Sequence, residues 1–176
     1  MVELSARKTM RLKGHDYSES GRYYFVTICT KDRMEWFGDA KDGKIILNEC
    51  GKIARSAWED IFQHFNQIEL DEFVVMPNHI HGILFVTPNG LDAAGNGHAH
   101  SLQDKNPQNR SRETIPVVIG SYKSAVTRQI HQNGILNFEW QKSFHDRIIR
   151  TEGSLEKIRE YILFNPSHLI GGAAHV

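Results

Sequence analysis

Short apolar runs alternate with longer amphipathic segments along the chain, in an order that predicts a mixed α+β fold. The aromatic and β-branched run at 22–30 predicts a first strand that is buried on both faces. The segment 73–86, FVVMPNHIHGILFV, predicts two more strands that meet at a tight turn, because Pro77 and Asn78 interrupt the apolar pattern. A fourth short strand is expected within 135–151.

Three segments carry apolar residues at helical spacing. Asn48 is the expected N-cap of a long amphipathic helix that reaches Phe65. A second helix is expected from about Ile115 to Gln132. The third should make about three turns, with Ser154 as its N-cap and Pro166 as its terminator.

The connecting segments are polar. Residues 31–47 predict a loop or short hairpin, in which Asp42-Gly43 is a favourable turn dipeptide. Residues 87–113 have no periodicity and are rich in Gly, Asn, Asp and His, so they predict a long polar excursion outside the core. His98 and His100 within it lack an apolar frame, and we expect them to belong to a solvated loop and not to a metal site.

The order strand, helix, strand, strand, helix, strand, helix is that of a ferredoxin-like βαββαβ sandwich with an added C-terminal helix. Two helices should cover one face of a four-stranded antiparallel sheet, which leaves the other face for the last helix. A chain of 176 residues fits a single core. We therefore expect one domain at 22–170, a basic N-terminal arm at 1–21 and a short tail at 171–176.

Composition restricts the possible partners and the compartment. The formal net charge is zero, so any nucleic-acid binding requires a local basic patch. Cys29 and Cys50 lack metal-ligand spacing and are expected to be buried free thiols in a reducing compartment. No apolar run reaches the ~18 to 20 residues of a membrane span, and the N-terminus lacks the apolar core of a signal peptide. These features predict a cytoplasmic protein without a membrane partner.

His79 and His81 are the first candidates for chemistry. Side chains alternate along a strand, so both imidazoles should lie on one face, with Ile80 on the other. Two imidazoles on one face form a pair of metal ligands, although such a pair also arises by chance in a chain with ten histidines. The strand-breaking Pro77 and Asn78 just before the pair favour the functional interpretation.

Tyr161 and Asn165 on the last helix are the second candidates, because residues four apart are neighbours on a helix. If this helix covers the histidine face, a phenol and an amide oxygen come close to two imidazoles. An ion held by two histidines and one oxygen keeps open positions for a phosphodiester. The alternatives are a core tyrosine and a helix C-cap. Tyr122 is a rival nucleophile, but its helix should place it in the core.

Four segments together resemble a known family: MPNHIHGILFV, YYFVTICT, WQKSFHDRIIR and REYILFNP. They are similar to the single-tyrosine HUH transposases, especially the REP-associated tyrosine transposases and their insertion-sequence relatives. The resemblance implies metal-dependent nicking and strand transfer of single-stranded DNA with hairpins, and a possible homodimer. In this resemblance, His79 and His81 match the paired ligands of Mg²⁺ or Mn²⁺, and Asn165 matches a third ligand. Tyr161 matches the nucleophile that forms a 5′-phosphotyrosine link.

Basic residues in three regions are candidates for DNA contacts, although any single one is more often a solvated charge. They lie on the N-terminal arm, on the second helix and near the fourth strand: Arg7, Lys8, Arg11, Lys13, Lys123, Arg128, Arg147 and Arg150. Two other functions compete with an active transposase. One is a domesticated protein that binds DNA hairpins without cleaving them, and the weaker one is a metal-dependent phosphodiesterase acting on RNA or a small nucleotide.

Overall fold

The structure is a computed structural model that describes residues 21–87 and 115–168. Residues 1–20, 88–114 and 169–176 lie outside the described part. The expectations for Arg7, Lys8, Arg11 and Lys13, for the polar segment beyond Thr87 and for the tail therefore concern residues that the structure does not describe. Within the described part, no helix has the length and apolar character that crossing a membrane requires.

Four antiparallel strands form the central sheet. They are β1 (Arg22–Cys29), β4 (Ile68–Met76), β5 (His79–Val86) and β6 (His145–Ile149), in the spatial order β4-β5-β1-β6. This order confirms the predicted ferredoxin-like α+β sandwich. β5 and β1 occupy the centre, so a site on these two strands has a neighbouring strand on each side.

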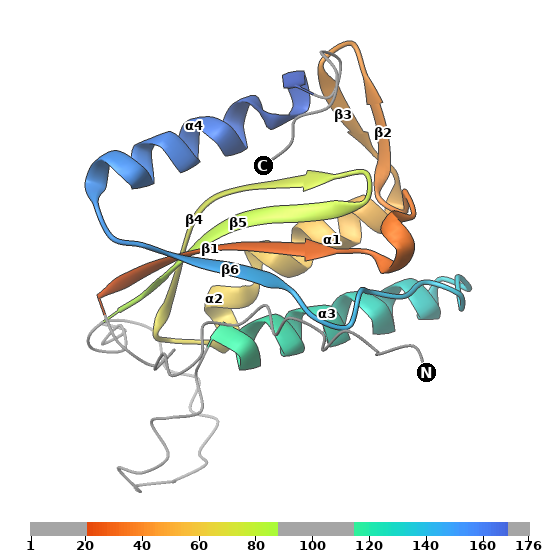
Figure 1. Ribbon diagram of the computed structural model, residues 1–176. Coiled ribbons are helices and arrows are strands. Elements are labelled where there is room, and N and C mark those ends of the chain that lie inside the picture. Colours follow the sequence, from red (N-terminus) through yellow and green to blue (C-terminus); the bar gives the residue numbers. More distant parts are fainter. Residues whose placement is uncertain (1–20, 88–114, 169–176) are drawn as a thin grey trace, which may run out of the picture.

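Helices cover both faces of this sheet (Figure 1). On one face lie α1 (Glu49–Glu59), α2 (Ile61–His64) and α3 (Ile115–Gln132), and on the other lies α4 (Glu152–His168). The main core lies under α1 and α3 and includes Trp58, which is fully buried. A separate small cluster of buried residues lies under α4: Ile83, Ile149, Leu155 and Ile162. The layers are therefore those expected from the sequence.

The first helical segment differs from the single long helix that its apolar spacing predicts. Asn48 caps α1 as expected, because its side-chain oxygen accepts a hydrogen bond from the backbone nitrogen of Gly51 at 3.0 Å. The helix then ends at Glu59, and the short α2 begins after Asp60. Phe62, beyond this break, is exposed. The apolar periodicity continues across the break, because α1 and α2 each pack one side against the same sheet.

β4 is longer than the strand predicted from 73 onward. The pairing register with β5 shifts between Leu70 and Phe73, which marks a β-bulge. A bulge interrupts the alternation of apolar and polar positions, so the first half of the strand lacks the pattern that predicts one. Asp71 and Glu72 lie within the bulge, where neither residue has a pairing partner on β5.

The segment between β1 and α1 contains the hairpin that the sequence predicts. β2 (Gly38–Lys41) pairs with β3 (Lys44–Leu47), and the turn residues Asp42 and Gly43 have φ angles of 52° and 72°. Two successive positive φ angles are the geometry of the hairpin turns that Asp-Gly favours. The hairpin stands beside the C-terminal end of α4 (Figure 1).

The predicted ends of the last helix were wrong. Thr151 provides the cap, because its side-chain oxygen accepts a hydrogen bond from the backbone nitrogen of Ser154 at 3.3 Å, which makes Ser154 an internal residue. Pro166 lies inside the helix, which continues to His168. Proline lacks the backbone N–H that would bond to Ile162, but α4 continues for two more residues.

Candidate active site

His79 and His81 both face α4 from the central strand β5. Their Nε2 atoms lie 3.1 Å apart, and their ring centroids are separated by 4.6 Å. Ile80, between them, is fully buried in the main core on the other side of the sheet. The alternation of strand side chains therefore places the two imidazoles together, as expected.

Each ring is oriented through its other nitrogen. Nδ1 of His79 lies 2.6 Å from Oδ1 of Asn78, and Nδ1 of His81 lies 2.8 Å from Oγ1 of Thr27 on β1. An amide oxygen can only accept, so Nδ1 of His79 carries its proton and Nε2 presents a lone pair. Such outer hydrogen bonds fix the tautomer and orientation of metal-binding histidines. Both Nε2 atoms are thus turned toward a common point.

The two imidazoles are neutral at physiological pH. Burial, aided by the positive charge of Arg33, lowers the pKa of His79 from 6.5 to about 4. Burial also lowers the pKa of His81 to about 3, with smaller contributions from His79 and Arg33. A histidine binds a metal ion only in its neutral form. The pair therefore needs no deprotonation before it can act as a ligand.

Tyr161 on α4 reaches this pair. Its hydroxyl oxygen lies 3.3 Å from Nε2 of His81, and its ring meets that of His81 at a centroid distance of 5.4 Å. Phe25 on β1 stacks on His81 at 5.2 Å and meets the Tyr161 ring edge-on at 6.2 Å. The phenol is half-buried. The structure therefore brings a phenol and two imidazoles together from two distant parts of the chain.

Tyr122, the rival nucleophile, lies on the other side of the sheet. It is buried in the main core, and its hydroxyl donates a hydrogen bond to the backbone oxygen of Ala54 at 2.9 Å. Burial raises its pKa well above 10. The expectation that Tyr122 is a core residue is confirmed.

Asn165 lies one turn after Tyr161 on α4. Its side chain is 7% exposed, and its Nδ2 atom has no hydrogen-bond partner among the residues described. A buried amide without a partner is costly unless something else contacts it. Asn165 is therefore placed as a polar group that faces inward from the same helix as Tyr161.

The histidine pair fits a divalent cation. If two ligand nitrogens each lie about 2.1 Å from one ion and subtend a right angle at it, they lie about 3.0 Å apart. This distance matches the 3.1 Å between the two Nε2 atoms. The described residues contain no cluster of three or more His, Cys, Asp or Glu side chains that could hold an ion. Among the described residues, the two histidines would supply two nitrogen ligands to an ion bound here.

Arg33 is a site residue that the sequence analysis missed. It follows β1 in a short 3-10 turn, Lys31–Arg33, where Asp32 and Arg33 have φ angles of 52° and 56°. Such left-handed angles are uncommon outside glycine and often occur at functional sites. The charge of Arg33 acts on both His79 and His81. No sequence pattern predicts this effect, because it depends on where the turn after β1 lies relative to β5.

The predicted DNA-binding residues within the described part fall into two groups. Arg147 and Arg150 are exposed at and just after the edge strand β6, and Arg147 is paired in register with Phe25. Because Phe25 contacts Tyr161, the Arg147 position belongs to the candidate active face. Lys123 and Arg128 lie on α3, on the opposite face of the sheet from Tyr161. The structure does not bring these two residues to the tyrosine and histidines.

Comparison with known proteins identifies the fold class. A solved structure of a REP-associated tyrosine transposase bound to a REP hairpin superposes with a TM-score of 0.54 at 20% sequence identity. The match covers 90% of this chain and 74% of that chain. The fold is therefore that of the tyrosine transposases.

A relative with higher sequence identity defines the family. The chain is 34% identical over 160 residues to an uncharacterized protein of Haemophilus influenzae, a match that covers 91% of this chain and 88% of the relative. The chain belongs to the same family as this protein. No protein-family model matches the chain.

Proposed function

We propose that this protein is a metal-dependent DNA nickase and strand transferase, a transposase that uses Tyr161 as its nucleophile. The observation that carries the proposal is the 3.3 Å approach of the Tyr161 hydroxyl to His81, whose Nε2 lies 3.1 Å from that of His79. A nucleophile beside a pair of metal ligands is an arrangement suited to phosphodiester chemistry. The transposase fold supports the same conclusion.

The proposed reaction is a transesterification. The Tyr161 oxygen attacks a DNA phosphorus and loses its proton, an O–P bond forms, and the bond from phosphorus to the 3′-oxygen breaks. The leaving 3′-oxygen takes up a proton and becomes a free 3′-hydroxyl, while the 5′ end remains on the tyrosine. Attack by that hydroxyl, or by another, on the phosphotyrosine restores the enzyme and joins the strands.

The chain's own residues hold and orient the reacting groups. His79 and His81 would hold Mg²⁺ or Mn²⁺, and Asn165 is the proposed third ligand. When bound, the ion neutralises charge on the phosphate oxygens and favours the ionised phenol. Thr27 and Asn78 keep both imidazoles aimed at the ion through their Nδ1 atoms. Imidazole ligands favour Mn²⁺ over Mg²⁺, so the first assays should compare the two.

Arg33 is proposed to contact the scissile phosphate. It carries the positive charge that acts on both histidines, and its guanidinium is exposed and therefore accessible to a ligand. A cation aimed at the phosphate stabilises the negative charge that develops during attack. Because the structural neighbour is described as bound to a REP hairpin, we propose hairpin DNA with a single-stranded segment as the substrate.

A covalent adduct tests the proposal. Hairpin DNA labelled at its 3′ end is incubated with the protein and Mn²⁺, and labelled protein is measured after denaturing electrophoresis. The wild-type protein should acquire the label because the 5′ end of the labelled fragment stays on Tyr161. Tyr161→Phe should abolish the labelled band, and His81→Ala should do the same.

Tyr23→Phe is the matched control, because Tyr23 packs beside Phe85 on the same face but makes no contact with the histidines. It should retain the adduct. An adduct that persists in Tyr161→Phe and disappears in Tyr122→Phe would contradict the assignment. Binding of the hairpin with no adduct under any metal condition would instead favour a protein that binds DNA without cleaving it.

A further inference from the structure

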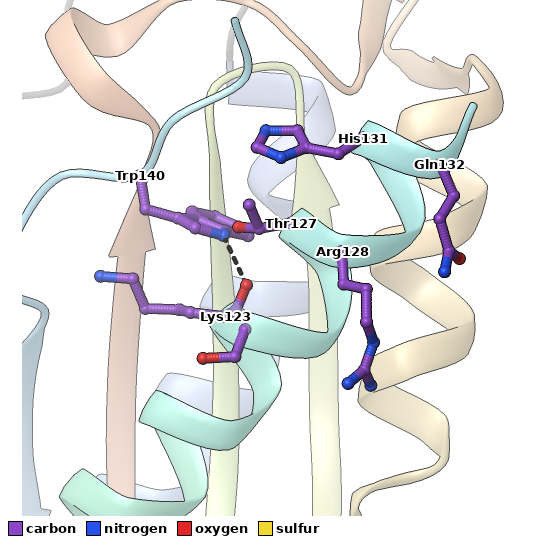
Figure 2. A pocket seen from close by; sticks show the side chains of 7 residues that line it. Lys123, Thr127, Arg128, His131, Gln132 and Trp140 are labelled. Carbon is purple, nitrogen blue, oxygen red and sulfur yellow. Dashed lines mark hydrogen bonds between the residues drawn. The ribbon is translucent and has the colours of Figure 1, made fainter. Parts of the chain in front are cut away.

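A second group of cationic and aromatic side chains lies on and beside α3, on the face of the sheet opposite Tyr161. It lines an open pocket of about 750 Å³, here called the α3 pocket, whose walls include Lys123, Ser124, Thr127, Arg128, His131 and Trp140. Figure 2 shows Lys123, Thr127, Arg128 and His131 extending from α3, with the Trp140 ring next to Lys123. No acidic residue of the described part lines the pocket. In a chain with zero formal net charge, this is a local positive surface.

Arg128 is the free cation of the pocket. It is exposed and makes no hydrogen bond or ion pair with any residue that the structure describes. Ser124 precedes it by one turn, and Thr127 and His131 lie on the same stripe of the helix. A guanidinium offers two parallel N–H groups that match phosphate geometry. Arg128 is therefore available to bind an anion from solution.

The opposite wall is held rigidly against α3. The Trp140 indole nitrogen donates to the backbone oxygen of Lys123 at 3.1 Å (Figure 2). Lys123 Nζ donates to the backbone oxygen of Gln141 at 2.6 Å. Because Lys123 is paired with a carbonyl and not with a carboxylate, its charge is not neutralised. Trp140 is only half-buried, so part of its ring faces the pocket. The wall thus combines a fixed cation with a flat apolar surface.

His131 adds a third polar group at the end of the pocket. Its Nε2 lies 3.3 Å from the backbone oxygen of Phe138, and since a carbonyl only accepts, this nitrogen carries the proton. Nδ1 then remains as the second functional nitrogen of a half-buried ring. The pocket therefore presents one held cation, Lys123, one free cation, Arg128, and one imidazole along α3, with the aromatic face of Trp140 beside them.

We propose that the α3 pocket is a second DNA contact, which binds the phosphodiester backbone through Arg128 and Lys123 while a sugar or base packs against Trp140. Basic side chains beside an aromatic surface are the usual means of holding nucleic acid without reading its sequence. The inference rests on the proposed function, since it takes DNA as the polymer that also reaches Tyr161. β6 is an edge strand, and Arg147 lies on its Tyr161 face, so one hairpin that passes around this edge can contact both faces.

Binding without cleavage tests the pocket by itself. In a Tyr161→Phe background, the affinity for a fluorescent DNA hairpin is measured by anisotropy over a range of salt concentrations. Arg128→Gln should weaken binding by about 10- to 100-fold, as expected for one charge-assisted hydrogen bond. It should also reduce the slope of log K against log salt by about 1. His131→Gln should weaken binding further when combined with Arg128→Gln.

Arg55→Gln is the matched control, because Arg55 is exposed on α1 and pairs with Glu59 outside the pocket. It should leave affinity and salt slope unchanged. If Arg128→Gln matches Arg55→Gln in both quantities, the inference is overturned. Binding of inorganic phosphate that is sensitive to Arg128, with no effect on DNA affinity, would also overturn it, since the pocket would then be a small-anion site.

Adduct formation with Tyr161 intact separates this inference from the proposed function. Arg128→Gln should raise the KM for hairpin DNA and leave kcat unchanged, because the pocket does not touch the reacting phosphate. If no DNA forms an adduct while Arg128→Gln still weakens binding, the nickase proposal fails and the pocket remains. If the adduct forms and Arg128→Gln changes neither KM nor affinity, the pocket proposal fails by itself.

Discussion

Arg159 joins the helix that carries Tyr161 to Asp71 in the bulge of β4. Its Nε and Nη2 atoms donate to the two carboxylate oxygens of Asp71 at 2.9 and 2.5 Å, and its Nη1 donates to Glu156 at 2.6 Å. The side chains of Arg159 and Asp71 are 28% and 15% exposed, so water screens the pair only in part. A two-point contact of this kind fixes the position of α4 along the sheet.

The first prediction concerns this pair. Arg159→Ala should lower the free energy of unfolding by about 1–3 kcal/mol, because it leaves the Asp71 carboxylate half-buried without its partner. It should also slow adduct formation, since Tyr161 follows Arg159 by two residues on the same helix. Urea denaturation and single-turnover kinetics measure the two effects. Arg55→Ala, on the exposed surface of α1, should change stability by less than about 0.5 kcal/mol.

A second prediction follows from the lowered pKa values of the two histidines. Both imidazoles stay neutral in the folded protein down to a pKa of about 4 for His79 and about 3 for His81. The unfolded chain takes up protons near pH 6.5. Between about pH 6.5 and 4 the unfolded state therefore binds more protons, and stability should fall as the pH falls.

Replacing both histidines tests this pH dependence. With a chelator present, the double variant His79→Gln, His81→Gln should show a flatter stability profile than the wild type between about pH 6.5 and 4. Urea midpoints measured at a series of pH values provide the comparison. Identical slopes for the two proteins would show that these imidazoles protonate at the same pH folded and unfolded.

A third prediction concerns the hydrogen bond behind His81. Thr27→Val keeps the shape of the side chain but removes the oxygen that lies 2.8 Å from Nδ1 of His81. Mn²⁺ affinity, measured by calorimetry, should fall by about 10- to 100-fold, the range typical of partners that orient a ligand. Thr87→Val is the control, because the Thr87 hydroxyl is buried and has no hydrogen-bond partner among the described residues.

The fourth prediction concerns Arg33. Arg33→Gln should slow adduct formation by about 100-fold if its guanidinium stabilises the charge on the reacting phosphate. It should also raise the pKa of His79 and His81, because it removes a nearby positive charge. Lys31→Gln, which removes the exposed partner of Glu139 in the same turn, should leave the rate unchanged. An equal loss in both variants would indicate that the turn itself, and not the guanidinium, matters.

The fold was predictable because its elements have clear hydrophobic periods. Alternation along 79–86 predicted which side chains of β5 meet the main core, and the apolar spacing of α3 gave its observed ends, Ile115 and Gln132. The ends of other elements depend on features that periodicity does not report. The bulge at Asp71 interrupts the alternation of side chains, so the pattern did not predict the first half of β4. The break at Asp60 divides a helix whose apolar pattern is continuous.

The candidate site was predictable to the extent that it follows from local geometry. Strand alternation places His79 beside His81, and helix spacing places Asn165 beside Tyr161. The approach of Tyr161 to His81 depended on a layer order that the element sequence implied. Arg33 and the Arg159–Asp71 pair escaped prediction, because each depends on a turn angle or a tertiary contact that single-residue patterns do not contain. Lys123 and Arg128 were predicted as DNA contacts, but their place beside Trp140 in one pocket was not.

The small size of the apolar cluster beneath α4 has a consequence for the local stability of this helix. Only 4 buried residues of the described part form that cluster, against 21 in the core on the opposite side. α4 can therefore detach from the sheet at a lower free energy than global unfolding requires. Gentle warming or dilute urea should abolish the proposed adduct formation at Tyr161 while circular dichroism still reports an intact sheet, and amide protons of α4 should exchange first.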